Sequence, residues 1–105
     1  MSIHHRNWEV FSFTNSGSNT LITGTSGQVI LLKSFIFTVD AETDVYICDS
    51  SGTQLTCTFQ YPNGGGVMTP DINFDILVAP GKNLCVNSSN AVTGSIMIDS
   101  QKKNI

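Results

Sequence analysis

The twelve residues QVILLKSFIFTV, Gln28–Val39, form the longest apolar segment of the chain. The segment is continuously apolar on both sides of the polar pair Lys33–Ser34, whereas a strand with one wet face would alternate. Its β-branched and aromatic residues also favour strand over helix. We therefore predict a long central strand of a β-sandwich, with a bend at Lys33–Ser34 that would let the strand serve both sheets.

Shorter strand-like segments recur on both sides of this segment. They are spaced about every 8–12 residues and separated by turns rich in Gly, Asn, Ser and Pro. Alanine is scarce, which disfavours helices. The pattern predicts an all-β fold, a jelly-roll-like antiparallel β-sandwich of about eight strands. The expected strands cover residues 8–13, 20–23, 28–39, 44–48, 53–61, 67–78, 84–86 and 91–99.

The length of 105 residues fits one domain that is large enough to bury its own core. Both ends of the chain are polar and lack the apolar alternation of the middle. The predicted parts are therefore an N-terminal arm at residues 1–7, a single β-sandwich domain at residues 8–100 and a C-terminal tail at residues 101–105.

The net charge of −3 is unevenly distributed along the chain. The predicted domain holds Lys33 and Lys82 against all eight acidic residues, and the other basic residues lie in the two ends. No basic stripe crosses the domain, so we expect no direct nucleic-acid binding. The basic ends are either solvated tails or docking segments for acidic neighbours. No segment approaches the ~20 apolar residues of a membrane span, and no membrane partner is predicted.

The three cysteines, Cys48, Cys57 and Cys85, are odd in number and lack the spacing of a metal site. Each lies in a strand-like segment, where a free thiol acts as a small hydrophobic group. We predict folding in a reducing compartment without a disulfide framework. The first residues also lack the apolar segment of a secretory signal.

Catalytic candidates are sparse. His4 and His5 lie in the predicted arm, where they would complete no Ser/His/Asp or Cys/His arrangement, although symmetry-related subunits could bring them together as metal ligands. Asp71 and Asp75 would share one strand face roughly 13 Å apart, too far for a glycosidase pair. We predict that the protein is not an enzyme and needs no cofactor.

Two binding alternatives stay open. The acidic segment Asp40–Asp44 could hold calcium, or it is an ordinary solvated connection without an EF-hand pattern. Trp8, Tyr46 and Tyr61 could form a platform that stacks on a sugar, or they belong to the core.

A series of glycines, turn residues and alternating apolar residues extends over about residues 20–99. It comprises Gly24-x-x-Gly27-x-Val29-x-x-Leu32-x-Ser34, Thr43-x-Val45-x-Ile47-x-x-Ser50, Gly64-Gly65-Gly66, Leu77-x-x-Pro80-Gly81-Lys82-Asn83-Leu84-x-Val86-Asn87 and Ala91-Val92-x-Gly94-x-Ile96. This series resembles the small jelly-roll proteins that decorate, or cement, the heads of tailed bacteriophages. Similar modules occur in head fibres and tail-associated proteins.

The resemblance implies a homotrimer on the outer surface of a virion capsid, made in the host cytoplasm and bound to the major capsid protein. In such proteins the arm and one end of the sandwich touch the shell. The glycine run is expected to be a wide flexible loop, with an assembly contact as the alternative. The contact residues expected on these grounds are His4, His5, Arg6, Trp8, Gly64, Gly65 and Gly66. The competing function is a carbohydrate-binding or adhesin-like module of a virion fibre or tail.

Overall fold

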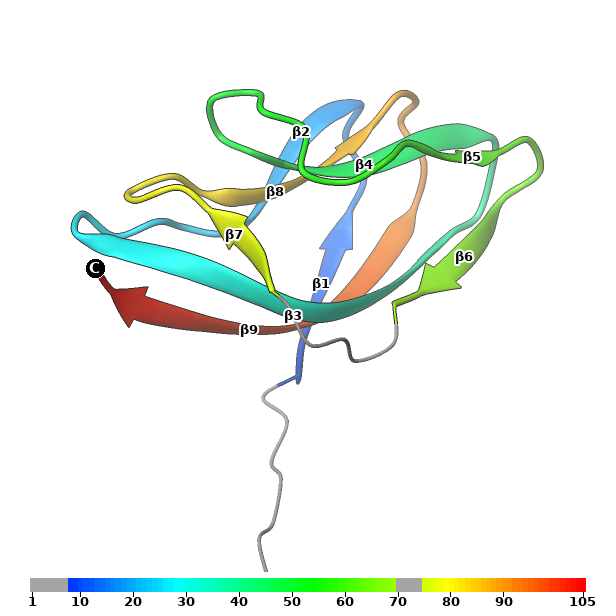
Figure 1. Cartoon of the computed structure of the whole chain (residues 1–105). Helices are drawn as coiled ribbons and strands as arrows, with labels where there is room; N and C mark the ends of the chain where they lie inside the picture. Colours follow the sequence, from blue (N-terminus) through cyan, green and yellow to red (C-terminus); the bar gives the residue numbers. More distant parts are fainter. Residues whose placement is uncertain (1–7, 70–74) are drawn as a thin grey trace, which may run out of the picture.

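The computed structural model describes residues 8–69 and 75–105. The expected arm with His4, His5 and Arg6, and the expected strand residue Asp71, lie outside the described residues. Within them, nine strands form two antiparallel sheets that face each other as two layers (Figure 1). The strands are β1 (Trp8–Phe13), β2 (Gly17–Ile22), β3 (Gln28–Val39), β4 (Thr43–Asp49), β5 (Phe59–Tyr61), β6 (Gly65–Met68), β7 (Ile76–Val78), β8 (Leu84–Ser88) and β9 (Gly94–Asn104).

The order of the strands is that of a jelly roll. One sheet, called sheet A here, has the order β1-β9-β3-β6, with β7 also paired to β3; sheet B has the order β2-β8-β4-β5. The first strand therefore pairs with the last, the second with the next to last, and so on inward to the β4–β5 pair. This nesting is the double Greek key of a jelly roll, which confirms the predicted fold class.

The central strand β3 has the predicted bounds, and it carries a bulge where the sequence predicts a bend. Its register with β9 shifts between Leu32 and Ser34, which places the extra residue at Lys33. β3 pairs with β7 before the bulge and with β6 after it. The segment predicted as one strand at 67–78 thus supplies two separate partners. The expectation that β3 would serve both sheets is wrong, because all its partners lie in sheet A.

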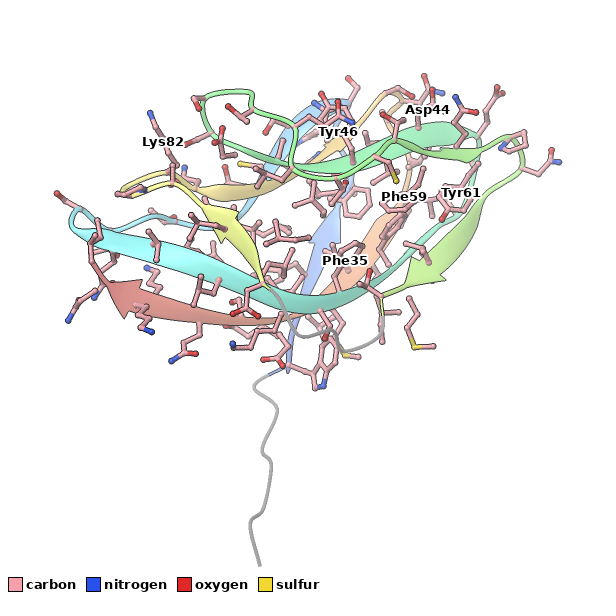
Figure 2. All side chains as sticks on the ribbon, viewed as in Figure 1. Phe35, Asp44, Tyr46, Phe59, Tyr61 and Lys82 are labelled. Atoms are coloured by element: carbon pink, nitrogen blue, oxygen red, sulfur yellow. The ribbon has the colours of Figure 1, made fainter. Side chains whose placement is uncertain are left out.

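An aromatic cluster joins the two sheets at one end of the core. Phe35 and Phe37 of β3 meet Phe59 of β5, with ring centroids 6.2 Å and 5.6 Å away. Tyr61 meets Phe37 edge-on at 5.8 Å. Figure 2 shows Phe35, Phe59 and Tyr61 between the layers. These rings come from the central strand and from the short edge strand β5, so they hold that edge of sheet B onto sheet A.

The strand predicted at residues 53–61 is wrong over most of its length, because only Phe59–Tyr61 is strand. The carboxylate of Asp49 starts a turn instead: its Oδ1 accepts hydrogen bonds from the Ser51 N–H at 2.9 Å and the Thr53 N–H at 3.1 Å. The Ser51 hydroxyl also donates to it, and this bond lowers the pKa of Asp49. The following residues form a loop along β4, where the Leu55 N–H donates to the Ile47 carbonyl at 2.8 Å.

The C-terminal tail predicted at residues 101–105 is also wrong. β9 continues to Asn104 and pairs with the start of β3, with Asn104 opposite Gln28. The Gln28 side-chain amide donates to Asn104 Oδ1 at 2.8 Å, and Lys102 donates to the Thr25 hydroxyl at 2.9 Å. The polar end of the chain is therefore part of sheet A.

Candidate functional site

The glycine run is a tight turn, not the wide flexible loop that the sequence predicts. Gly64 and Gly65 have φ angles of 87° and 143°, and β6 starts at Gly65. A side chain at Gly65 would meet the Tyr61 ring, and one at Gly66 would meet the Phe37 carbonyl. The turn geometry and the close packing thus account for all three glycines. Their contact with a partner stays a prediction.

An apolar row crosses the outer face of sheet A. Val10 points outward because its neighbour Phe11 packs against the core. The register places Val10 of β1 opposite Met97 of β9, and Met97 opposite Ile36 of β3. Ile36 is in turn opposite Met68 of β6. We call these four residues the apolar row; they lie side by side on four neighbouring strands and span roughly 14 Å.

The two ends of the apolar row are open to solvent. Val10 is 67% exposed and Met68 is 69% exposed, while Met97 and Ile36 are partly exposed. A shallow groove of about 340 Å³ lies over the β3–β6 junction beside Ile36 and Met68. Large apolar side chains that lie next to one another and are exposed to solvent often mark a surface on which another protein docks.

Trp8, the one predicted contact residue outside the arm and the glycine run, borders this row. It is the first residue of β1 and is partly exposed. Two positions from Val10 on the same strand, it lies on the same face of sheet A. Its register partner on β9 is Asp99. The structure thus brings Trp8 to the apolar row. It leaves Gly64 in the turn before β6, and Gly65 and Gly66 are the first two residues of β6.

The outer face of sheet B has a different character. Asn87 of β8 lies opposite both Ser18 of β2 and Tyr46 of β4, which makes a polar row across three strands. Figure 2 shows Tyr46 and Asp44 on the outer side of β4. The two outer faces therefore differ in these rows: sheet A carries the apolar row, whereas the row across sheet B is polar.

The three aromatic residues of the possible sugar platform do not come together. Trp8 lies on the outer face of sheet A, whereas Tyr46 lies on the outer face of sheet B. Tyr61 packs against Phe37 in the aromatic cluster, and burial raises the pKa of its hydroxyl. A platform that combines all three is excluded by this arrangement.

The acidic segment Asp40–Asp44 has structural roles. Asp40 Oδ1 accepts a hydrogen bond from the Thr93 N–H at 3.0 Å, which fixes the approach to β9. Across residues 8–69 and 75–105, no group of three or more His, Cys, Asp or Glu side chains could hold a metal ion. Asp75 forms an ion pair with Lys33 at 3.1 Å. The described part of the chain also has no helix that is long and apolar enough to cross a membrane.

The chain matches no protein-family model, and no curated protein matches it in sequence.

Two cross-strand features could not be predicted from the sequence. The apolar row could not be found because its members lie far apart in the sequence and meet only through strand pairing. The alternation of WEVFSF places Trp8 and Val10 on one face, which was the only available signal. The direct pairing of Cys48 with Cys85 across β4 and β8 was missed for the same reason.

Proposed function

We propose that the protein is a virion structural protein, a head-decoration protein that binds the outer surface of a phage capsid and stabilises the shell. The observation that carries this proposal is the apolar row on the outer face of sheet A. The jelly-roll fold supports it, because this fold is common in viral capsid proteins, although it also occurs in lectins.

The chemistry of the row suits the centre of a protein–protein interface. Such centres are depleted in charged residues and enriched in methionine and aromatic side chains. Met68, Met97 and the neighbouring Trp8 fit this composition. Fully burying a side chain such as Val10 or Met68 contributes about 1.5–3 kcal/mol to association.

The position of the row at two sheet edges favours assembly with more than one neighbour. β1 lies at one edge of sheet A, and β6 and β7 lie at the other, both paired to β3. Exposed edges need protection, and burial in a closed oligomer is one way to provide it. We propose a homotrimer that sits on the major capsid protein, with the edge strands at the contacts.

A pair of lysine variants tests the proposal. Met68→Lys places a charge at one end of the apolar row, and Gln60→Lys places the same charge at an exposed position on β5 of sheet B. Wild-type protein and both variants are mixed with undecorated heads of the virus that encodes the chain, and binding is measured by cosedimentation.

We expect wild-type protein and Gln60→Lys to bind alike and Met68→Lys to bind at least tenfold more weakly, because a desolvated lysine opposes burial. Thermal unfolding of all three proteins checks that the fold is intact. A wild-type protein that does not bind the heads contradicts the proposed function. Equal binding by all three contradicts the role of the row.

The polar row on sheet B favours a second candidate, a carbohydrate-binding module of a virion fibre or tail. Asn87 and Tyr46 together offer an amide and an aromatic hydroxyl, the kind of groups that hold a sugar. A glycan array distinguishes the two candidates. Binding that is lost in Tyr46→Ala and kept in Met68→Lys supports the carbohydrate function.

A further inference from the structure

Cys48 and Cys85 face each other across the β4–β8 pair. They are direct register partners, and both are free thiols. Their chain neighbours Ile47 and Val86 are fully buried in the core, so the two cysteines point to the outer side of sheet B. They are nevertheless only 2% and 1% exposed. Two sulfur atoms are thus held together in a covered position.

The backbone hydrogen bonds show which type of cross-strand pair this is. The Ile47 N–H donates to the Thr56 hydroxyl and the Ile47 carbonyl accepts from Leu55, so both groups point away from β8. The backbone N–H and carbonyl groups of the next residue, Cys48, therefore point toward Cys85. Pairs of this type have Cα atoms about 5.5 Å apart, within the range of a disulfide. Their Cβ atoms lie up to ~5.5 Å apart, more than a relaxed disulfide prefers.

The surroundings keep the thiols covered. The Cys48 and Cys85 sulfur atoms each lie 3.9 Å from a hydroxyl of β2, that of Ser18 and that of Thr20 respectively. Gln54, in the loop after β4, forms an antiparallel backbone β-bridge with Cys48 on the side of β4 that faces away from β8. Burial raises the pKa of the Cys48 thiol, which therefore stays protonated at neutral pH.

We propose that Cys48 and Cys85 form a reversible cross-strand disulfide that ties β4 to β8 when the protein passes from reducing to oxidising surroundings. The two S–H bonds break and one S–S bond forms. A small disulfide such as oxidised glutathione accepts the two electrons and two protons and leaves as two thiols. The wide Cβ spacing strains the bond, which makes it easier to reduce than a relaxed structural disulfide.

The bond closes a loop of roughly 38 residues, which restricts the unfolded chain. Even with part of this effect offset by strain, we expect the melting temperature of the oxidised protein to rise by at least about 5 °C. The inference rests on the cysteine pair alone and does not depend on the proposed capsid function.

Thiol counting tests the proposal. Cys57 is exposed and far more accessible, so Cys57→Ser removes its contribution while it leaves the pair intact. Cys57→Ser protein is equilibrated with mixtures of reduced and oxidised glutathione. Parallel samples start from the folded protein and from the unfolded protein during refolding, so that slow access to the buried thiols does not decide the result. After denaturation, free thiols are alkylated and counted by mass spectrometry.

We expect two free thiols under reducing conditions and none under oxidising conditions, with a peptide that contains the Cys48–Cys85 link. Cys57→Ser/Cys85→Ser serves as the control and forms no internal link. Two free thiols or two glutathione adducts in oxidised Cys57→Ser protein, from both starting points, would overturn the proposal. An oxidised protein that melts at or below the reduced one would overturn the stabilising role.

Discussion

The contact between Phe13 and Gly94 predicts that Gly94→Ala destabilises the wild-type protein but does not destabilise a variant that lacks the Phe13 ring. Phe13 of β1 and Gly94 of β9 are cross-strand partners, and the Phe13 side chain is 3% exposed. A methyl group at Gly94 would overlap the outer atoms of the Phe13 ring, Cζ, Cε1 and Cε2. The ring lies over the glycine as in known aromatic–glycine pairs of β-sheets. Gly94→Ala must therefore displace a buried ring.

The expected cost follows from this overlap. Overpacking a core usually destabilises by about 1–3 kcal/mol. Gly94 does not have a positive φ, so its backbone accepts alanine. Where no ring opposes the methyl group, alanine should stabilise a strand by about 0.5–1 kcal/mol relative to glycine. In Phe13→Leu the three overlapping ring atoms are absent, so Gly94→Ala should be neutral or stabilising there.

The assay is urea denaturation of wild-type protein, the two single variants and the double variant. We expect a coupling free energy of about 1–4 kcal/mol between the two positions, which is the difference between the cost of Gly94→Ala in the wild type and its effect in Phe13→Leu. All four proteins should stay folded, because a domain of this size has roughly 5–15 kcal/mol of stability. If Gly94→Ala costs the same free energy in both backgrounds, the ring does not lie against Gly94 and the reasoning is wrong.

Three further substitutions test individual polar contacts. Thr43→Val should cost about 1–3 kcal/mol, because the buried Thr43 hydroxyl accepts from the Asn90 N–H at 3.2 Å and the valine leaves that donor unpaired; urea denaturation measures the loss. The fold lowers the pKa of Asp49, so its carboxylate stabilises the folded protein above the ordinary pKa of 3.8. This stabilisation is lost as the pH falls through the folded pKa. Asp49→Asn should therefore flatten the fall in melting temperature between about pH 5 and 2. Lys33→Ala should change the free energy of unfolding by less than about 1 kcal/mol, because its ion pair with Asp75 is partly solvated.

The sequence predicts those parts of the fold where local pattern and tertiary pairing agree. β3 carries apolar residues on both faces, although only its inner face is buried and outer residues such as Ile36 are partly exposed. This long apolar segment allowed its bounds to be read directly from the sequence. The alternation in Trp8–Phe13 likewise gives β1. Turn residues with positive φ, such as Gly81, mark the end of β7 and the start of β8.

The sequence fails where a distant contact decides the structure. The apolar residues Leu55 and Cys57 alternate as in a strand, but the Asp49 turn directs the chain along β4 as a loop. The three consecutive glycines predict a flexible loop, yet the Tyr61 ring packs so close to Gly65 that a side chain there would collide with it. Residues 101–104 resemble a tail because their side chains are polar and all four are exposed, although their backbone pairs with β3. Side-chain polarity alone does not reveal such pairing.

The candidate site was predicted only in part for the same reason. Trp8 was singled out, but the neighbours that make it part of an apolar surface come from four strands and depend on register. The resemblance to head-decoration proteins supplied the functional hypothesis, and the apolar row supplies a surface on which to test it.

The central claim is that the outer face of sheet A is the assembly surface. Hydrogen–deuterium exchange of the free and the capsid-bound protein tests this claim most directly. The account predicts that binding slows amide exchange in the edge strands β1 and β6 and leaves β2 and the loop after β4 unchanged. Slower exchange confined to β2, β4 or β5, with β1 and β6 unaffected, would contradict it.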